Sequence, residues 1–142
     1  MPLEALHPMM VHFPIALLWA ALLVETLALA FRKPGWHKIT LWNLVLGTWG
    51  ALAAAVTGGI SAAAVGAPPT QAAARGLEAH SVWGMSAFAL AVTVNAWHLA
   101  AGQQMKRPAR WMAWGLLALT CGVMTYAGHL GARLVYEHGL AR

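Results

Sequence analysis

Apolar residues run through this chain in four long stretches that are separated by polar links. Each stretch reaches or exceeds the roughly 20 residues that a helix needs to cross the hydrocarbon core of a bilayer. The predicted spans are residues 11–31, 39–65, 80–101 and 111–130. The pattern therefore predicts an all-α integral membrane protein in which residues 1–142 form a single domain.

The links between the spans indicate how the helices are arranged. Two links are short, from Arg32 to Lys38 and from Gly102 to Arg110. The third opens with Gly66-Ala67-Pro68-Pro69, and we expect it to continue as a surface loop to Ala79. Because short links make consecutive helices antiparallel neighbours, we predict a four-helix bundle with up-down-up-down topology.

Composition supports a membrane environment. The chain is 60% hydrophobic and 9% charged, with a mean hydropathy of +0.61, whereas soluble domains carry about 25% charged residues. Its net charge of +5 is divided among short clusters, which argues against nucleic acid as a partner. The single cysteine, Cys121, allows neither an intrachain disulfide nor covalent attachment of haem, which requires two cysteines before a histidine. The N-terminus lacks a basic n-region, so we expect it to remain in the mature protein.

Lysine and arginine are distributed unevenly between the two predicted faces. The two short links contain Arg32, Lys33, Lys38, Lys106, Arg107 and Arg110. The opposite face has only Arg75, Arg133 and Arg142. Because positively charged loops remain in the cytoplasm, we expect a multi-pass protein of a bacterial inner membrane with both termini in the periplasm.

Five of the seven histidines are expected at the periplasmic face. His12 opens the first span and His80 opens the third. His129 lies about 27 Å along the fourth helix from Trp111, by the helical rise of about 1.5 Å per residue. The two termini bring the remaining pair, His7 and His138, to the same face. Histidine is costly in lipid unless it faces the bundle interior, so this group is a candidate cofactor site.

Neutral imidazole is a ligand for haem iron, copper and zinc. We favour haem b because the site lacks cysteine and has few carboxylates. Apolar residues that would surround the macrocycle are available nearby, namely Met9, Met10, Phe13, Trp83 and Met85. The first and third helices of an antiparallel bundle lie diagonally opposite, so we expect His12 and His80 to be the axial ligands. His129 could replace either of these ligands. Alternatively, His129 could form a second haem site together with His7 or His138.

Two further groups lie outside this layer. His80 and His98 are five helical turns apart on one face, so a second haem at the opposite membrane face, with His37 as partner, is an alternative. Glu25 lies within the first span. It would either form a proton or quinone site or be a protonated glutamate that is hydrogen-bonded to a neighbouring helix. The sequence contains no motif of hydrolytic or phosphoryl-transfer enzymes.

Two motifs at opposite ends of the chain are distinctive. They are HPMMVHFPIAL, from His7 to Leu17, and GARLVYEHG, from Gly131 to Gly139. They resemble the HPxxVHFPIAL and GGxLVYxHG motifs of a bacterial membrane family known as domain of unknown function 2231, with Ala132 in place of the usual glycine. The resemblance covers essentially the whole chain and implies a four-span protein. Some relatives are joined to Rieske or cytochrome c modules, which implies membrane electron transfer.

We therefore expect a membrane-bound b-type cytochrome with one haem, or two in the alternative arrangement. It would transfer electrons between a periplasmic partner, such as a cytochrome c or Rieske-type protein, and a quinone or another membrane redox protein. The sequence does not distinguish an electron carrier from a subunit of a quinone-linked oxidoreductase. A copper- or zinc-binding membrane protein and a cofactor-free structural or assembly subunit are the two other interpretations.

Overall fold

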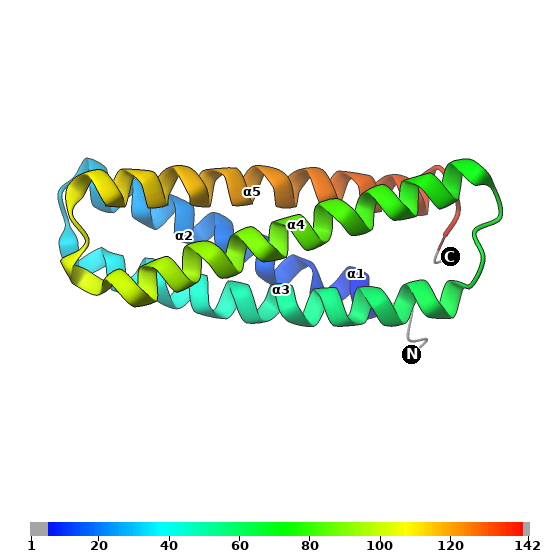
Figure 1. Cartoon of the computed structure of the whole chain (residues 1–142), viewed down its shortest axis with the longest axis horizontal. Helices are drawn as coiled ribbons and strands as arrows, with labels where there is room; N and C mark the ends of the chain where they lie inside the picture. The colour runs from blue at the N-terminus through cyan, green and yellow to red at the C-terminus, as the bar shows by residue number, and fades with distance from the viewer. Residues whose placement is uncertain (1–5, 141–142) are drawn as a thin grey trace.

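The computed structural model describes residues 6–140, apart from the side chains of residues 65 and 103. The described residues form α-helices and short 3-10 helices and contain no strand (Figure 1). The helices are α1 Leu6–Met10, α2 His12–Ala30, η2 Pro34–Trp36, α3 His37–Val65, α4 Gln71–Ala101, η3 Gly102–Gln104 and α5 Arg107–Tyr136. Backbone hydrogen bonds continue across Val11, so α1 and α2 act as one rod.

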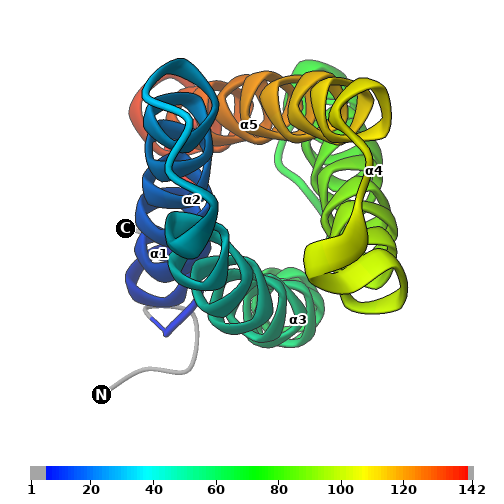
Figure 2. The same ribbon diagram turned by 90° about the vertical axis from the view of Figure 1, so that its left-hand side faces the viewer.

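Four helical segments are long and apolar enough to span a membrane: Leu6–Ala30, Pro34–Ala64, Gln71–Ala101 and Arg107–Tyr136. Seen along its axis, the bundle places α2, α3, α4 and α5 at four corners (Figure 2). Helices that follow one another in the chain are neighbours, whereas α2 faces α4 across the diagonal and α3 faces α5. The predicted all-α membrane bundle is therefore confirmed.

The two ends of the bundle differ in what they contain. One end holds the links between α2 and α3 and between α4 and α5, and we call it the linker end (Figure 1). The other holds the link between α3 and α4 and the described parts of both termini, and we call it the terminal end.

The third link is much shorter than the sequence predicted. Helix α4 begins at Gln71, so the loop predicted to reach Ala79 covers only residues 66–70. The side-chain oxygen of Thr70 accepts a hydrogen bond of 3.1 Å from the backbone N–H of Ala73, which caps the new helix. Alanine-rich residues follow this cap, and alanine is the best helix former. His80 is therefore the tenth residue of a helix and not its first.

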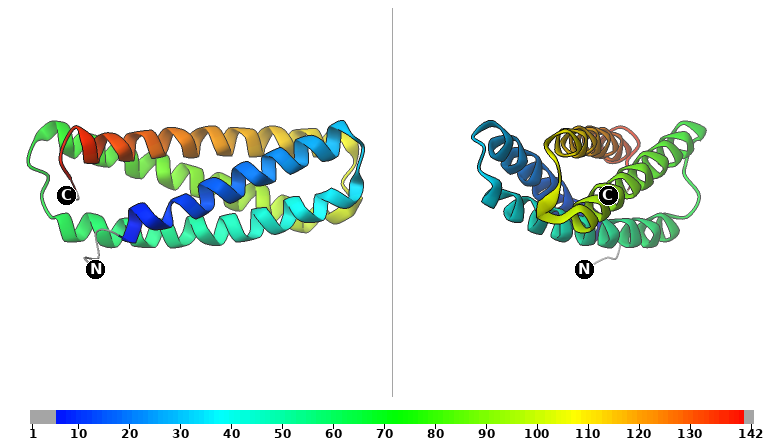
Figure 3. Two further views of the ribbon diagram at one scale, coloured as in Figure 1. Left: turned by 180° about the vertical axis from the view of Figure 1, so that it is seen from behind. Right: turned by 60° about the vertical axis from the view of Figure 1, so that its left-hand side comes forward.

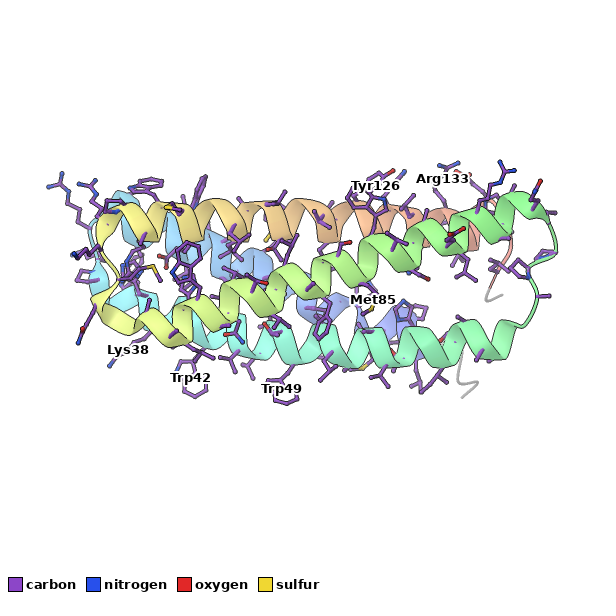
Figure 4. All side chains as sticks on the ribbon, in the orientation of Figure 1. Lys38, Trp42, Trp49, Met85, Tyr126 and Arg133 are labelled. Atoms are coloured by element: carbon purple, nitrogen blue, oxygen red, sulfur yellow. The ribbon has the colours of Figure 1, made fainter. Side chains whose placement is uncertain are left out.

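Inward-facing positions follow a heptad-like spacing on each long helix. Helix α2 buries Pro14, Leu18, Ala21, Glu25 and Ala28. Large apolar side chains cover the outside, as Trp42 and Trp49 show where they project away from α3 (Figure 4). Such an exposed apolar surface is what a lipid environment stabilises.

The bundle consists of two similar helical hairpins. The rod of α1 and α2 with α3 forms the first, and α4 with α5 forms the second. Helices α2 and α4 are both inclined across the bundle, on opposite sides of its long axis (Figures 1 and 3). Inward positions correspond at a constant offset: His7, Leu44, Ala54 and Gly58 match His80, Leu117, Ala127 and Gly131, each 73 residues later. The two hairpins are therefore related by an approximate two-fold axis along the bundle.

Candidate functional site

His7 and His80 are anchored in the same way in the two hairpins. The Nδ1 atom of His7 lies 2.9 Å from the backbone oxygen of Ala54, and Nδ1 of His80 lies 2.9 Å from that of Ala127. Each acceptor is 47 residues beyond its histidine. Because a carbonyl only accepts, each ring donates through Nδ1–H in its neutral form, which leaves the lone pair on Nε2.

The two rings meet across the bundle. They project from α1 and α4, which lie on one diagonal, and their centroids are 5.9 Å apart with ring planes at 76°. Both side chains are half-buried. Among residues 6–140, the hydrogen bonds of both rings are made through Nδ1, and neither Nε2 atom has a protein partner. When both rings are neutral, the pair therefore offers two imidazole nitrogens with free lone pairs at the terminal end of the bundle.

Glycine is required beneath each ring. A Cβ atom built on Gly58 would lie 3.0 Å from Cε1 of His7, and one on Gly131 would lie 2.9 Å from Cε1 of His80. Both distances are shorter than ordinary van der Waals contact, so any larger residue would displace the imidazole. The nearest inward positions on α3 and α5 are also small, being Ala54 and Ala127.

The other histidines predicted for this site do not join the pair. His12 is exposed, and its Nδ1 bonds to the backbone oxygen of Pro8 at 2.7 Å in its own helix. His129 is exposed as well. His138 is half-buried close to Gly76. The sequence predicted that His12 would face His80 across the diagonal of the bundle. In the structure, His7 lies against His80 in place of His12.

The side chains of Glu137 and Arg133 form the main charged contact near His129 and His138. Arg133 donates three hydrogen bonds of 2.8–3.0 Å to the Glu137 carboxylate. These bonds lower the pKa of Glu137 below its ordinary value, and the two histidines lower it further. Both members of this ion pair are exposed, so it lies on the surface of the terminal end.

The apolar residues expected around a macrocycle mostly point outwards. Met9, Phe13, Trp83 and Met85 are 53%, 62%, 41% and 55% exposed. The reason is periodicity: only one residue in three or four on each helix can face the bundle axis. Small residues, and not these large ones, surround the imidazole pair.

The donor set fits an iron held by two histidines. Imidazole nitrogens are donors that haem iron takes, and Nε2 of His7 and Nε2 of His80 would be the two atoms to hold it. A metal-bound imidazole usually donates its other N–H to a group such as a backbone carbonyl, which fixes the orientation and tautomer of the ring. Within the described residues, no group of three His, Cys, Asp or Glu side chains could hold a metal ion, so a closed zinc site is not formed by them.

A second polar group lies at the linker end. Glu25 is fully buried, and its Oε2 accepts a hydrogen bond of 2.8 Å from Nδ1 of His37. Its Oε1 lies 3.6 Å from Nη1 of Arg110. His98, which is 6% exposed, lies within electrostatic range of all three. The sequence singled out Glu25 but did not predict that Arg110 and both linker-end histidines would surround it.

One sequence signal could have identified His7 in place of His12. His7 lies two helical turns before the buried Pro14, so it is on the face of the rod that points into the bundle. His12 lies on another face. Helix α4 repeats this spacing, with His80 two turns before buried Ala87. Comparing the two halves of the chain at a fixed offset would have paired His7 with His80.

Fold, apolar surface and buried polar groups together define a four-span α-helical membrane protein. The family model described as "Predicted membrane protein (DUF2231)" matches residues 3–142. The chain therefore belongs to this family. No curated protein and no solved structure matches it.

Proposed function

We propose that this protein is a membrane-bound b-type cytochrome in which His7 and His80 are the axial ligands of a non-covalent haem. One observation carries the proposal: two imidazoles from diagonal helices lie 5.9 Å apart, each with Nδ1 bonded to a carbonyl and Nε2 without a partner among the described residues. Bis-histidine ligation between helices is a standard way to bind haem in a bundle.

The protein's own groups would set the properties of such a centre. Ala54 and Ala127 fix the orientation and tautomer of the two rings through their carbonyl oxygens. The glycines beneath the rings admit them to the bundle interior. Haem supplies one-electron redox chemistry when bound, and the apolar surroundings would keep water away from it.

The terminal end would face the periplasm of a bacterial inner membrane. Five of the six basic residues in the short links are exposed at the opposite end: Arg32, Lys33, Lys38, Lys106 and Arg107. The sixth, Arg110, is buried beside Glu25 and adds no charge to the surface. At the terminal end Arg75 and Arg133 are exposed, and Arg142 lies outside the described residues. A haem between His7 and His80 would thus lie near a periplasmic donor or acceptor such as a cytochrome c or Rieske-type protein, with a quinone or another membrane redox protein as the other partner.

Absorption spectroscopy tests the proposal. Protein purified in detergent after expression with ample haem should show a Soret band that shifts when dithionite is added. His7→Ala and His80→Ala should each lose most of this absorbance, because each removes one axial ligand. His12→Ala is the matched control, since His12 is exposed and bonded within its own helix, and it should retain the haem.

Three results would count against the proposal in different ways. A colourless wild-type protein under these conditions would overturn it. Copper or zinc in equal amount to protein, without pyridine haemochrome absorbance, would assign the same histidines to a metal ion. Loss of haem in His12→Ala with full retention in His7→Ala would reject the assigned ligand pair.

A further inference from the structure

The polar cluster at the linker end is built by all four long helices. Glu25 comes from α2, His37 from α3, His98 from α4 and Arg110 from α5. Glu25, His98 and Arg110 are 0%, 6% and 7% exposed, and the side chain of His37 is 12% exposed. The two-fold relation pairs Glu25 with His98 and His37 with Arg110, each 73 residues apart. The cluster therefore lies on the same axis as the imidazole pair, at the other end of the bundle.

Two atoms of the cluster have no hydrogen-bond partner among the described residues. They are Oε1 of Glu25 and Nε2 of His98, and both are fully shielded by protein. One turn further inside, Thr40 Oγ1 and Asn95 Oδ1 are in the same condition. Buried polar atoms are nearly always satisfied by protein or by bound water, and a water with two to four polar partners is stable in such a site.

The hydrogen bond of each ring indicates which nitrogen carries the proton when that ring is neutral. His37 donates to the Glu25 carboxylate through Nδ1, and His98 donates through Nδ1 to the backbone oxygen of Val94 at 2.9 Å. In the neutral form, both rings therefore have their lone pair on Nε2. The charges of Arg110 and Glu25 cancel, so the cluster is neutral when both imidazoles are neutral. One added proton changes its net charge by one.

Access to the cluster is one-sided. His37 is the first residue of α3 and retains some exposure at the linker end. Towards the terminal end, the axis is filled by Leu18, Ala21, Leu44, Ala91, Val94 and Leu117. The basic side chains of the adjoining links are exposed, and none of them forms an ion pair with Glu25 among the described residues.

We propose that Glu25, His37, His98 and Arg110 form a proton-binding site that exchanges with solvent only at the linker end. A solvent proton binds Nε2 of His37, and the Nδ1 proton of the same ring passes to Oε2 of Glu25, which leaves a neutral imidazole and a carboxylic acid. Water held between Oε1 of Glu25 and Nε2 of His98 extends the exchange to the second ring. When the extra proton is absent, the positive charge of Arg110 balances the negative charge of the Glu25 carboxylate.

Nitrogen NMR of histidine tests this site directly. The wild-type protein in detergent, labelled with ¹⁵N in histidine only, reports the protonation of each ring over pH, and His37→Gln and His98→Gln assign the two signals. We expect the rings of His37 and His98 to change protonation over a common pH interval. Glu25→Gln keeps the shape of the side chain but removes its charge. The pH interval over which the rings of His37 and His98 change protonation should therefore shift. Glu137→Gln, which removes an exposed carboxylate, is the matched control and should leave both unchanged.

Two results would overturn the proposal. The first is a His98 ring that stays neutral at every pH at which the protein remains folded. The second is a His98 titration that is identical in wild type and Glu25→Gln; if that variant does not fold, His37→Gln gives the same comparison. These signals are independent of His7 and His80, so haem-free protein serves equally well and failure of the haem proposal would leave this test intact.

Discussion

At the scale of single residues, the imidazole pair depends on two glycines that contribute no side chain. Each glycine allows a histidine ring to lie directly against a neighbouring helix, where the ring reaches a carbonyl one turn away. A carbonyl in an α-helix already accepts one backbone hydrogen bond, and its second lone pair is available to the ring. The position of each histidine is thus determined by backbone atoms of a distant segment.

Gly58→Ala and Gly131→Ala should displace the rings that they contact. The added methyl group would lie 3.0 Å or less from an imidazole carbon, and overpacking of this kind costs about 1–3 kcal/mol of stability. If haem is bound, losing the carbonyl partner should weaken binding roughly 10–100-fold, which a haem titration measures. Gly59→Ala is the control because nothing lies within 4 Å of its added Cβ, and it should be neutral or slightly stabilising. Equal effects of Gly58→Ala and Gly59→Ala would contradict the close contact.

Removing Arg110 should be far more damaging than removing Arg133. Arg110→Met leaves the buried carboxylate of Glu25 without its cation, and breaking a buried ion pair costs about 3–5 kcal/mol. Arg133→Met breaks an exposed ion pair and should change stability little. Thermal unfolding in one detergent compares the two variants. Similar midpoints would show that the Glu25 cluster contributes no more than a surface contact.

At the scale of elements, helix boundaries near polar loops were the least predictable feature. The two prolines before Thr70 indicated a loop, but the predicted loop was too long. The helix continues beyond the end of its apolar stretch, so the apolar stretch alone does not mark where the helix begins. Residues 71–79 are rich in alanine and include Arg75 and Glu78, which suit a helix that extends beyond the hydrocarbon core. The helix therefore starts where its cap is, and not where the apolar stretch begins.

Thr70→Ala should loosen the first turn of α4. Loss of the N-cap hydrogen bond to Ala73 costs about 1 kcal/mol. Hydrogen exchange of the amides at the start of α4 should speed up, while the core of the helix stays protected. The control is Thr93→Ala, since Thr93 is exposed and bonds only to Ala89 within α4. Unchanged exchange in Thr70→Ala would show that the cap does not define this end.

At the scale of the whole molecule, the bundle places a polar site at each end of one axis with an apolar layer between. The site at the terminal end is symmetric in composition, with two histidines. In the cluster at the linker end the equivalent positions hold different residues, Glu25 with His98 and His37 with Arg110. Equivalent helices bring equivalent positions to the axis, and the residue types then decide the chemistry. This arrangement explains why both sites combine residues that are far apart in the chain.

Cysteine labelling should establish how the molecule is oriented. Cys121 is fully buried, and Cys121→Ala provides a background without thiols. On that background, Ala67→Cys at the terminal end should react with an impermeant thiol reagent applied to intact cells. Lys38→Cys at the linker end should react only after the membrane is opened. The reverse pattern would invert the proposed topology without affecting the bundle.

The sequence by itself determined the membrane class, the four spans and their antiparallel order. These features depend on the local hydropathy and length of each segment, which any single stretch of chain contains. The tertiary structure decided that Arg110 and His98 enclose Glu25. It also showed that His7 and not His12 faces His80, which only the 73-residue offset between the two halves of the chain could have indicated beforehand. Those contacts depend on the rotation of each helix about its axis and on the glycines that set helix separation, and both are fixed only when all four helices pack together.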